Sequence, residues 1–459
     1  RLSPEVKARV QCAFREKVFR PVYRCLEETK PFWWFTVTNN WNSVCLAGVT
    51  GAALTLLADK EERAYFVAAA EKYNVYGMKG YADDGYCSEG VGYYNYGFRA
   101  YILLREEVCR ATQGKIDFFR EPKFVHIAQY GPKFVRIARY GKKIQMNEGV
   151  CPAYSDCRIG LSPDKFILDY CDRALGITSA EEKYILPSGN NFSLYLIELF
   201  PHQVWKMEMT DGIRQALQEG SDSLRAYYEK AGILVARPAK GSSCTLAVSA
   251  KGGNNAENHN HNDIGSYAVA LGKCTMVGDQ GGPFSYPGDY FSAEAPEKYK
   301  IKGSFGHPVP VVDGKTQSSG AKASAIVLKK EFTDVKDLLC IDYTSAYATP
   351  SLDKLVRTFV YDRQGKGSFT VGDEFTANAP IRFETAITTQ ANWKIIDDTH
   401  LLLTTGTEQM TVTIEASGKV AFTSETIEVN SPAYTRIGIS LKEQSKDGYI
   451  RLTMRTKQL

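Results

Sequence analysis

The sequence contains no hydrophobic run of the roughly 18 residues that a membrane-spanning helix needs, which predicts a chain without a membrane span. It also lacks a strong excess of one charge, because 56 Lys and Arg stand against 52 Asp and Glu, for a net charge of +4. So small a net charge argues against a nucleic-acid-binding protein, which would need a strongly basic face. It fits an enzyme that concentrates positive charge in one cleft to hold an acidic ligand.

Paired cysteines are missing as well. None of the 11 cysteines forms a CxxC pair, so the sequence indicates neither a cysteine zinc site nor a disulfide framework. Several stand inside apolar runs and are expected to act as small buried hydrophobic residues: Cys45, Cys109, Cys244, Cys274 and Cys340.

Histidine is scarce, with six in the chain, yet two of the six stand two residues apart in Asn-His-Asn-His-Asn-Asp-Ile-Gly-Ser at 258–266. On a strand, residues i and i+2 share a face, so His259 and His261 would both point into one cleft. Asparagine is a poor strand former, so the three asparagines at 258, 260 and 262 indicate a role other than stability. The alternative is an Asn-capped polar turn whose histidines face solvent.

Hydrophobic periodicity divides the chain into two halves. Apolar residues at helical spacing predict helices at 5–26, 43–57, 92–109, 162–175 and 191–209. Strand-forming residues between turns predict strands at 245–249, 266–271, 354–361, 411–415 and 448–455. The length of 459 residues suggests two domains, and we place their boundary where Gly232, Pro238 and Gly241 cluster. The prediction is a helical toroid or bundle over 1–231 and an antiparallel β-sandwich over 232–459.

A metal site is the second hypothesis. His261, Asp279 and His307 make a His/Asp/His donor set that suits zinc. Their separations of 18 and 28 residues are long, and three unrelated strands could carry the residues to different places. The spacing therefore allows a site without establishing one.

The helical half holds two polar and aromatic segments. Residues 83–97 crowd tyrosine and glycine ahead of a helix. Tyrosine can transfer protons when nearby positive charge lowers its pKa of about 10, but with 27 tyrosines in the chain most must be structural. The second segment covers residues 31–42. Its Asn39 and Asn40 amides can donate hydrogen bonds to a carboxylate. Trp34 and Trp41 offer faces for a sugar ring, although tryptophan is more often a core residue.

Together, four segments resemble the heparinase II/III-like polysaccharide lyases over about residues 30–315. The segments are Asn-Asn-Trp-Asn at 39–42, Asp-Gly-Tyr-x-x-Glu-Gly-x-Gly-Tyr at 84–93, His-Asn-His-Asn-Asp-Ile-Gly-Ser at 259–266 and Phe-Gly-His-Pro-Val-Pro at 305–310. The resemblance implies an incomplete (α/α) toroid followed by a layered antiparallel β-domain. It also implies a secreted or periplasmic lyase that cleaves an acidic, glycosaminoglycan-like polysaccharide by β-elimination.

The resemblance implies a role for individual residues. Tyr93 would transfer protons at the scissile bond, while Asn40 and His259 neutralise the uronate carboxylate. One structural zinc ion would be bound by the ligand set His261, Asp279 and His307. A second tyrosine would come from the β-domain, with Tyr290 and Tyr299 as equal candidates. Substrate-binding candidates lie beside these positions: Asn39, Trp41, Glu89, Tyr96, Asn258 and Trp34.

The chain departs from the family pattern at three places. Trp41 stands where many relatives carry a histidine that serves as a second base, which favours a syn route with Tyr93 as both base and acid. Asn95 and Phe284 stand where alginate-cleaving relatives carry arginines, which argues against alginate as the substrate.

Two other classes of protein remain open. A zinc-dependent hydrolase would use a metal-bound water as nucleophile. A non-catalytic carbohydrate-binding protein would use Trp33, Trp34 and Trp41 as a stacking surface. The sequence leaves open which polymer is bound, whether cleavage is endo or exo, and the oligomeric state.

Overall fold

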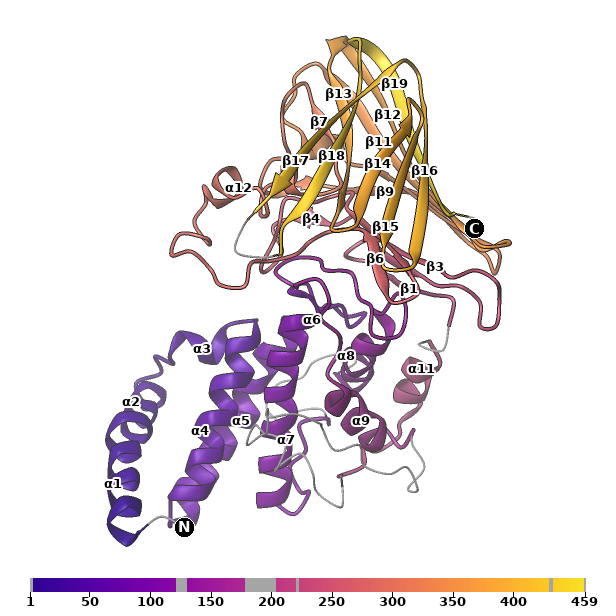
Figure 1. Ribbon diagram of the computed structural model, residues 1–459. Helices are drawn as coiled ribbons and strands as arrows, with labels where there is room; N and C mark the ends of the chain where they lie inside the picture. The colour runs from indigo at the N-terminus through magenta and orange to yellow at the C-terminus, as the bar shows by residue number, and fades with distance from the viewer. Residues whose placement is uncertain (1–2, 121–129, 178–203, 220–222, 429–431, 458–459) are drawn as a thin grey trace. The chain divides into compact units, whose positions relative to one another are not determined.

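The structure, a computed structural model, describes residues 3–120, 130–177, 204–219, 223–428 and 432–457 (Figure 1). Contacts group the chain into two compact units. The helical unit comprises Arg1–Cys87, Tyr93–Gly141 and Pro163–Gly220, and the strand unit comprises Ser88–Gly92, Lys142–Ser162 and Ser221–Leu459. Two segments that precede residue 232, Ser88–Gly92 and Lys142–Ser162, thus belong to the strand unit.

The helical unit is built from short and medium-length helices. Among the described residues they are α1 (Pro4–Phe14), the π-helical turn η1 (Arg15–Phe19), α2 (Arg20–Glu27), α3 (Trp33–Thr36), α4 (Asn40–Leu56), α5 (Lys60–Lys79), the π-helical turn η2 (Tyr94–Phe98), α7 (Arg99–Ala111), α8 (Tyr130–Lys143), α9 (Lys165–Ala174) and α11 (Asp211–Glu219). The short helix α6 (Gly90–Tyr93) belongs to the strand unit except for Tyr93, and the last two residues of α8 belong to the strand unit too. Asn42 of α4 ties its neighbours together, because its amide donates to the carbonyls of Phe35 and Tyr73 at 2.8 and 3.2 Å. The guanidinium of Arg105 lies buried in α7 and bonds Asp117 and the Tyr170 hydroxyl.

In the part of the strand unit that the structure describes, the strands form four antiparallel sheets. The first has the order β1 (Arg225–Tyr228), β2 (Ile233–Ala236), β3 (Leu246–Ala250), β5 (Tyr267–Leu271), β6 (Cys274–Val277). The largest has the order β14 (Asn392–Asp397), β15 (His400–Thr405), β16 (Glu408–Ala416), β19 (Ser445–Thr456), β12 (Ser368–Ile381), β11 (Leu352–Asp362), β10 (Lys336–Asp342), β9 (Ile326–Phe332). The third has the order β17 (Val420–Ile427), β18 (Tyr434–Leu441), β13 (Phe383–Thr389), β7 (Val311–Val312), and the fourth pairs β4 (Asn254–Asn255) with β8 (Gly320–Ser324).

The largest sheet carries its apolar residues on one face. Leu339, Phe359, Val371, Leu452 and Ile414 stand opposite one another across five successive strands, and all are buried. They belong to one core that also takes in side chains of the first and third sheets. Because strand side chains alternate between faces, this register buries every second residue and packs the sheets as a sandwich.

The predicted fold class, helices followed by an antiparallel β-sandwich, is confirmed. All five predicted strands are present, and the predicted helices at 43–57 and 162–175 correspond to α4 and α9. The predicted helix at 191–209 lies mostly outside the described residues, and 204–209 form no helix. Of the cysteines that stand in apolar runs, Cys109 and Cys244 are buried as expected, whereas Cys45, Cys274 and Cys340 are partly exposed. Over the described ranges, no helix is both long and apolar enough to cross a membrane.

Candidate functional site

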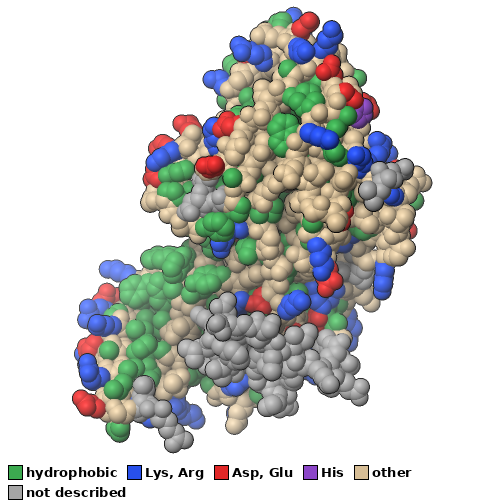
Figure 2. Space-filling view, viewed as in Figure 1, with side chains coloured by type: hydrophobic (Ala, Val, Ile, Leu, Met, Phe, Trp, Pro, Cys, Tyr) green, Lys and Arg blue, Asp and Glu red, His purple; other side chains and the backbone are tan. Residues whose placement is uncertain are grey.

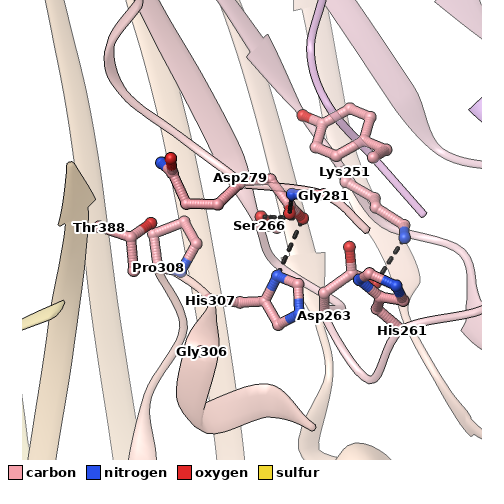
Figure 3. A network of polar contacts seen from close by, with 12 residues as sticks. Lys251, His261, Asp263, Ser266, Asp279, Gly281, Gly306, His307, Pro308 and Thr388 are labelled. Atoms are coloured by element: carbon pink, nitrogen blue, oxygen red, sulfur yellow. Dashed lines mark hydrogen bonds and ion pairs between the residues drawn. The ribbon is translucent and has the colours of Figure 1, made fainter. Parts of the chain in front are cut away.

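The three residues predicted to bind metal come together in the strand unit. Ligand atoms of His261, Asp279 and His307 all lie within 4.8 Å of one another. His261 comes from the loop between β4 and β5, Asp279 follows β6, and His307 follows the 3-10 turn η3 (Ser304–Gly306). All three are buried, with exposed fractions of 0, 1 and 1%. Figure 3 shows His307 directed at Asp279, with His261 beside them.

Hydrogen bonds orient two of these side chains. Nε2 of His307 lies 2.9 Å from the carbonyl oxygen of Ile301, and its Nδ1 lies 2.9 Å from Oδ2 of Asp279. Oδ1 of Asp279 accepts a hydrogen bond from the amide of Gly281 at 2.8 Å. Burial would raise the pKa of Asp279, but the charge and hydrogen bond of His307 outweigh burial and hold that pKa below its usual value. For His307, burial lowers the pKa, and Asp279 more than offsets this, so its pKa is raised.

The donor set fits a divalent ion. Nδ1 of His261 is buried and has no hydrogen-bond partner in the described part of the chain, whereas Nε2 of the same ring lies 2.9 Å from Oδ1 of Asp156. A metal-binding histidine commonly uses one nitrogen for the ion and donates from the other to a carboxylate or carbonyl. His261 and His307 both show this arrangement, the second with Ile301 as acceptor. Two imidazoles and one carboxylate form a typical set of zinc ligands.

A buried arginine that the sequence analysis missed joins two of these loops. Nη1 of Arg357 donates to the carbonyls of Gly265 and Pro308, at 2.7 and 2.8 Å. Gly265 follows His261 in its loop, and Pro308 follows His307. Asp373 balances the arginine charge through hydrogen bonds of 2.7 and 2.6 Å. Arg357 therefore connects the His261 and His307 loops to β11.

His259 lies in a turn, as the alternative interpretation of this segment predicted, and not on a strand, although His261 is buried and does not face solvent. The φ of His259 is +55°, a left-handed conformation that few non-glycine residues adopt and that ends strand geometry. Gly265 has φ +89° and turns the same segment again before β5. His259 and His261 nevertheless reach one group, because Nδ1 of His259 lies 2.5 Å from Oδ2 of Asp156.

Asp156 is the second residue that the sequence analysis missed. Its side chain is fully buried, and it also accepts a hydrogen bond of 3.0 Å from the hydroxyl of Tyr290. Burial would raise the pKa of Asp156, but hydrogen bonds from His259 and His261 outweigh it and keep the pKa well below its usual value. Asp156 stands 103 residues before His259, in a segment predicted to belong to the helical domain, so no local signal reveals it.

The structure distinguishes the two tyrosine candidates. The fully buried Tyr290 places its hydroxyl 3.0 Å from Asp156 and 3.2 Å from Nε2 of His261. Burial and the Asp156 carboxylate raise the pKa of Tyr290 far above 10, so this hydroxyl keeps its proton. The hydroxyl of Tyr299 donates instead to the exposed Asp289 at 2.5 Å. Tyr290 therefore joins the histidines, and the Tyr299 hydroxyl points elsewhere.

Two further candidates of the strand unit, Glu89 and Asn258, lie near His259, together with two aromatic rings that the sequence analysis did not single out. The buried Glu89 places Oε2 3.7 Å from Nε2 of the imidazole. The rings of Tyr286 and Phe291 have centroids 6.3 and 5.4 Å from that of His259, and both are exposed. Asn258, immediately before His259, is exposed as well.

The catalytic candidates of the helical unit lie on α4 and near η2. Tyr93 is the last residue of α6 and stands directly before η2; such π-helical turns occur often at functional sites. Gly97 lets this turn approach α4 closely, because a Cβ atom there would lie 2.8 Å from Cβ of Asn40. Asn40 and the turn after Tyr93 are thus brought together. Tyr96, within that turn, is exposed.

The asparagine and tryptophan candidates near α3 and the start of α4 make different contacts. Asn39 caps α4, because its side-chain oxygen accepts from the amide of Trp41 at 3.0 Å. Trp34 stacks on Phe35, with centroids 3.9 Å apart. Trp33 and Trp41 meet edge to face at 5.9 Å and are 61 and 48% exposed. Figure 2 shows hydrophobic side chains gathered on the visible face of the helical unit around α3.

Comparison with known proteins yields structural matches alone. No family model and no curated protein sequence matches the chain. A solved heparinase III with methylated lysines is similar over 92% of this chain and 59% of its own, with a TM-score of 0.61 and 14% identity. The heparan sulfate lyase HepC of Pedobacter heparinus gives 92 and 60% coverage, a TM-score of 0.61 and 13% identity. Another heparinase III gives 92 and 62%, a TM-score of 0.60 and 14% identity.

These matches show a heparinase III-like fold, with a helical N-terminal part and a C-terminal β-sandwich. The chain spans about three fifths of the length of these solved chains. At 13 to 14% identity the similarity describes the fold alone.

Proposed function

We propose that the protein is a polysaccharide lyase that cleaves a uronate-containing, glycosaminoglycan-like polymer by β-elimination. One observation carries this proposal: on a heparinase III-like fold, the His259-x-His261 segment places its two histidines in different surroundings. His261 joins the buried cluster with Asp279 and His307, which could hold a metal ion, while His259 keeps 18% of its side chain exposed and contacts Asp156. The heparan sulfate lyase of similar fold supports the class of substrate.

The proposed chemistry starts at the carboxylate of the uronate. The proton on C5 is very weakly acidic while that carboxylate carries its full charge, so hydrogen bonds from Asn40 and His259 would stabilise the developing negative charge. Tyr93, as phenolate, takes the C5 proton and returns it to the oxygen that leaves C4. The C4–O bond breaks and a C4=C5 double bond forms, so no water is consumed.

The proposed metal, zinc, has a structural role. His261, Asp279 and His307 would hold it, and its charge would stabilise three loops against one another. The cluster is almost completely buried, which supports a structural ion over one that activates water on a substrate. This burial argues against the hydrolase alternative, in which a metal-bound water must reach the substrate. Exposed Trp33 and Trp41 would suit a binding protein, and they suit a lyase that grips a sugar chain equally well.

The test is near-ultraviolet absorbance during incubation with heparan sulfate, chondroitin sulfate, hyaluronan, alginate and gellan. We expect absorbance to rise with one of the glycosaminoglycans, because elimination leaves a conjugated double bond. Tyr93→Phe should lower that rate at least about 100-fold, the contribution of a positioned proton-transfer group. Tyr76→Phe, a partly exposed tyrosine of α5, is the matched control.

Two results would contradict the proposal. New reducing ends without absorbance would indicate hydrolysis, and near-native turnover in Tyr93→Phe would remove Tyr93 from the mechanism. Polymer binding with no product of either kind would favour the carbohydrate-binding alternative.

A further inference from the structure

One buried carboxylate contacts both histidines of the His259-x-His261 segment. The two oxygens of Asp156 divide between them, with Oδ2 2.5 Å from Nδ1 of His259 and Oδ1 2.9 Å from Nε2 of His261. Building on the proposed function, we propose that Asp156 is a positioning residue that orients the uronate-binding histidine and a metal ligand together. Asp156 itself would touch neither the substrate nor the metal.

The chemistry of the carboxylate determines both imidazole tautomers. An ionised carboxylate only accepts hydrogen bonds, so each ring nitrogen that faces it must carry hydrogen. His261 then presents Nδ1 as its lone pair, and this is the buried atom that has no hydrogen-bond partner among the described residues. His259 is held through Nδ1, so Nε2 is the nitrogen that turns away from Asp156, toward Glu89 at 3.7 Å.

Asp156 lies outside the metal cluster. The ligand group found among the described residues contains His261, Asp279 and His307 and does not include Asp156. Tyr290 adds a third donor, with its hydroxyl 3.0 Å from Oδ1, which restrains the same oxygen that holds His261. This matches the carboxylate–histidine–metal arrangement in which an outer carboxylate orients a ligand. A second histidine on the other oxygen extends that arrangement to the proposed substrate site.

The backbone shows independently that the loop after Asp279 packs closely against the Asp156 segment. A Cβ atom on Gly281 would lie 1.6 Å from the carbonyl oxygen of Cys157, and one on Gly282 would lie 2.8 Å from Cα of Asp156. The two glycines stand two and three residues after Asp279, so the loop that carries this proposed metal ligand also admits the Asp156 segment. The left-handed backbone of His259 is a strained conformation of the kind that surrounding contacts must hold in place.

Asp156→Asn tests the proposal with almost no change in size. The zinc affinity, measured by competition with a chromophoric chelator, should fall about 10- to 100-fold, as is typical when a carboxylate behind a metal ligand is lost. With zinc saturating, kcat should still be at least tenfold below wild type and KM should change less. Asp289→Asn is the control, because Asp289 is exposed and bonds Tyr299 and Lys298, and both quantities should stay within twofold.

A second measurement does not depend on catalysis. In the zinc-loaded protein with ¹⁵N-labelled histidine, the His259 ring should show a hydrogen-bonded Nδ1–H that Asp156→Asn weakens or removes. If the Asn variant does not fold, Asp156→Glu keeps the charge and displaces the carboxylate by one methylene. That variant keeps a carboxylate that can accept from His261, so it should still bind zinc, but it should turn over more slowly than wild type.

Three outcomes would overturn the proposal: unchanged zinc affinity in Asp156→Asn, full recovery of turnover at saturating zinc, or wild-type turnover in Asp156→Glu. The second would leave Asp156 serving His261 alone. If the wild-type protein cleaves no polymer, the lyase proposal fails, whereas zinc affinity and the His259 ring signal still decide the role of Asp156.

Discussion

At the scale of single residues, Tyr290 and Tyr299 show how the neighbouring groups determine what a tyrosine hydroxyl can do. The two rings lie close, with centroids 5.6 Å apart, yet their hydroxyls donate to different carboxylates. Tyr290 is buried against Asp156, which raises its pKa and suits it to keep a proton. Tyr299 donates to Asp289 at the surface, where water can replace that hydrogen bond.

Tyr290→Phe should therefore lower the free energy of unfolding by about 1 kcal/mol, the usual net value of one hydrogen bond, with more if Asp156 is left short of a donor. Turnover should fall as well, because Asp156 loses a restraint. Tyr299→Phe should stay within about 0.5 kcal/mol of wild type, as for most surface changes. Urea unfolding and steady-state rates measure both variants, and equal effects of the two would contradict the assignment.

At the scale of elements, the loop after β6 both carries Asp279 and packs against the segment of Asp156 and Cys157. It carries Asp279 and then Gly281, which has φ +69° and packs against the Cys157 carbonyl. Any other residue at position 281 would be strained in this left-handed backbone, and its Cβ atom would collide with the carbonyl oxygen of Cys157. The loop thus fixes the proposed metal ligand Asp279 and packs against the Asp156 segment at the same time.

Gly281→Ala should cost about 1 to 3 kcal/mol from the left-handed backbone alone, and the close contact with Cys157 adds to this. It should also weaken zinc binding, because Asp156 is displaced. Gly288→Ala is a control in the same loop, since nothing lies within 4 Å of its Cβ position and its φ is not in the left-handed region. Thermal unfolding with and without zinc compares them; a wild-type melting temperature for Gly281→Ala would show that the segments do not approach this closely.

At the scale of the whole molecule, the proposed metal ligands all come from one compact unit. His261, Asp279 and His307 belong to the strand unit, and Arg357 connects two of their loops to its largest sheet. Zinc should therefore stabilise this unit in particular, because an ion that binds only the folded state shifts the folding equilibrium.

Calorimetry tests this expectation. Zinc at 100 times its dissociation constant should stabilise the strand unit by about 2.7 kcal/mol, and a chelator should reverse the effect. His261→Ala should lower the metal content and make the unfolding transition insensitive to the chelator. Unchanged metal content in that variant would refute the ligand set, and a zinc-bound protein with an unchanged melting temperature would refute the structural role.

Much of the fold could be predicted because secondary structure leaves a local pattern. Apolar residues recur at helical spacing in α4 and α9, and strand-forming residues mark β3, β5, β11, β16 and β19. The assignment of Lys142–Ser162 to the helical half could not be checked by such patterns, because the segment is irregular after its first two residues, which end α8, and its partners lie in the strand unit. Periodicity shows which element a segment forms and is silent about where an irregular segment packs.

The sequence by itself determined the order of helices and sheets and the candidates His261, Asp279 and His307, because residue type and spacing are local properties. Only the tertiary structure decided that these three meet, that His259 leaves strand geometry, and that Tyr290 rather than Tyr299 turns to the histidines. The same holds for Asp156 and Arg357, which stand 105 and 92 residues from the positions they bond, His261 and Gly265. A buried charge must find its partners across the fold, and their identity depends on how distant segments pack.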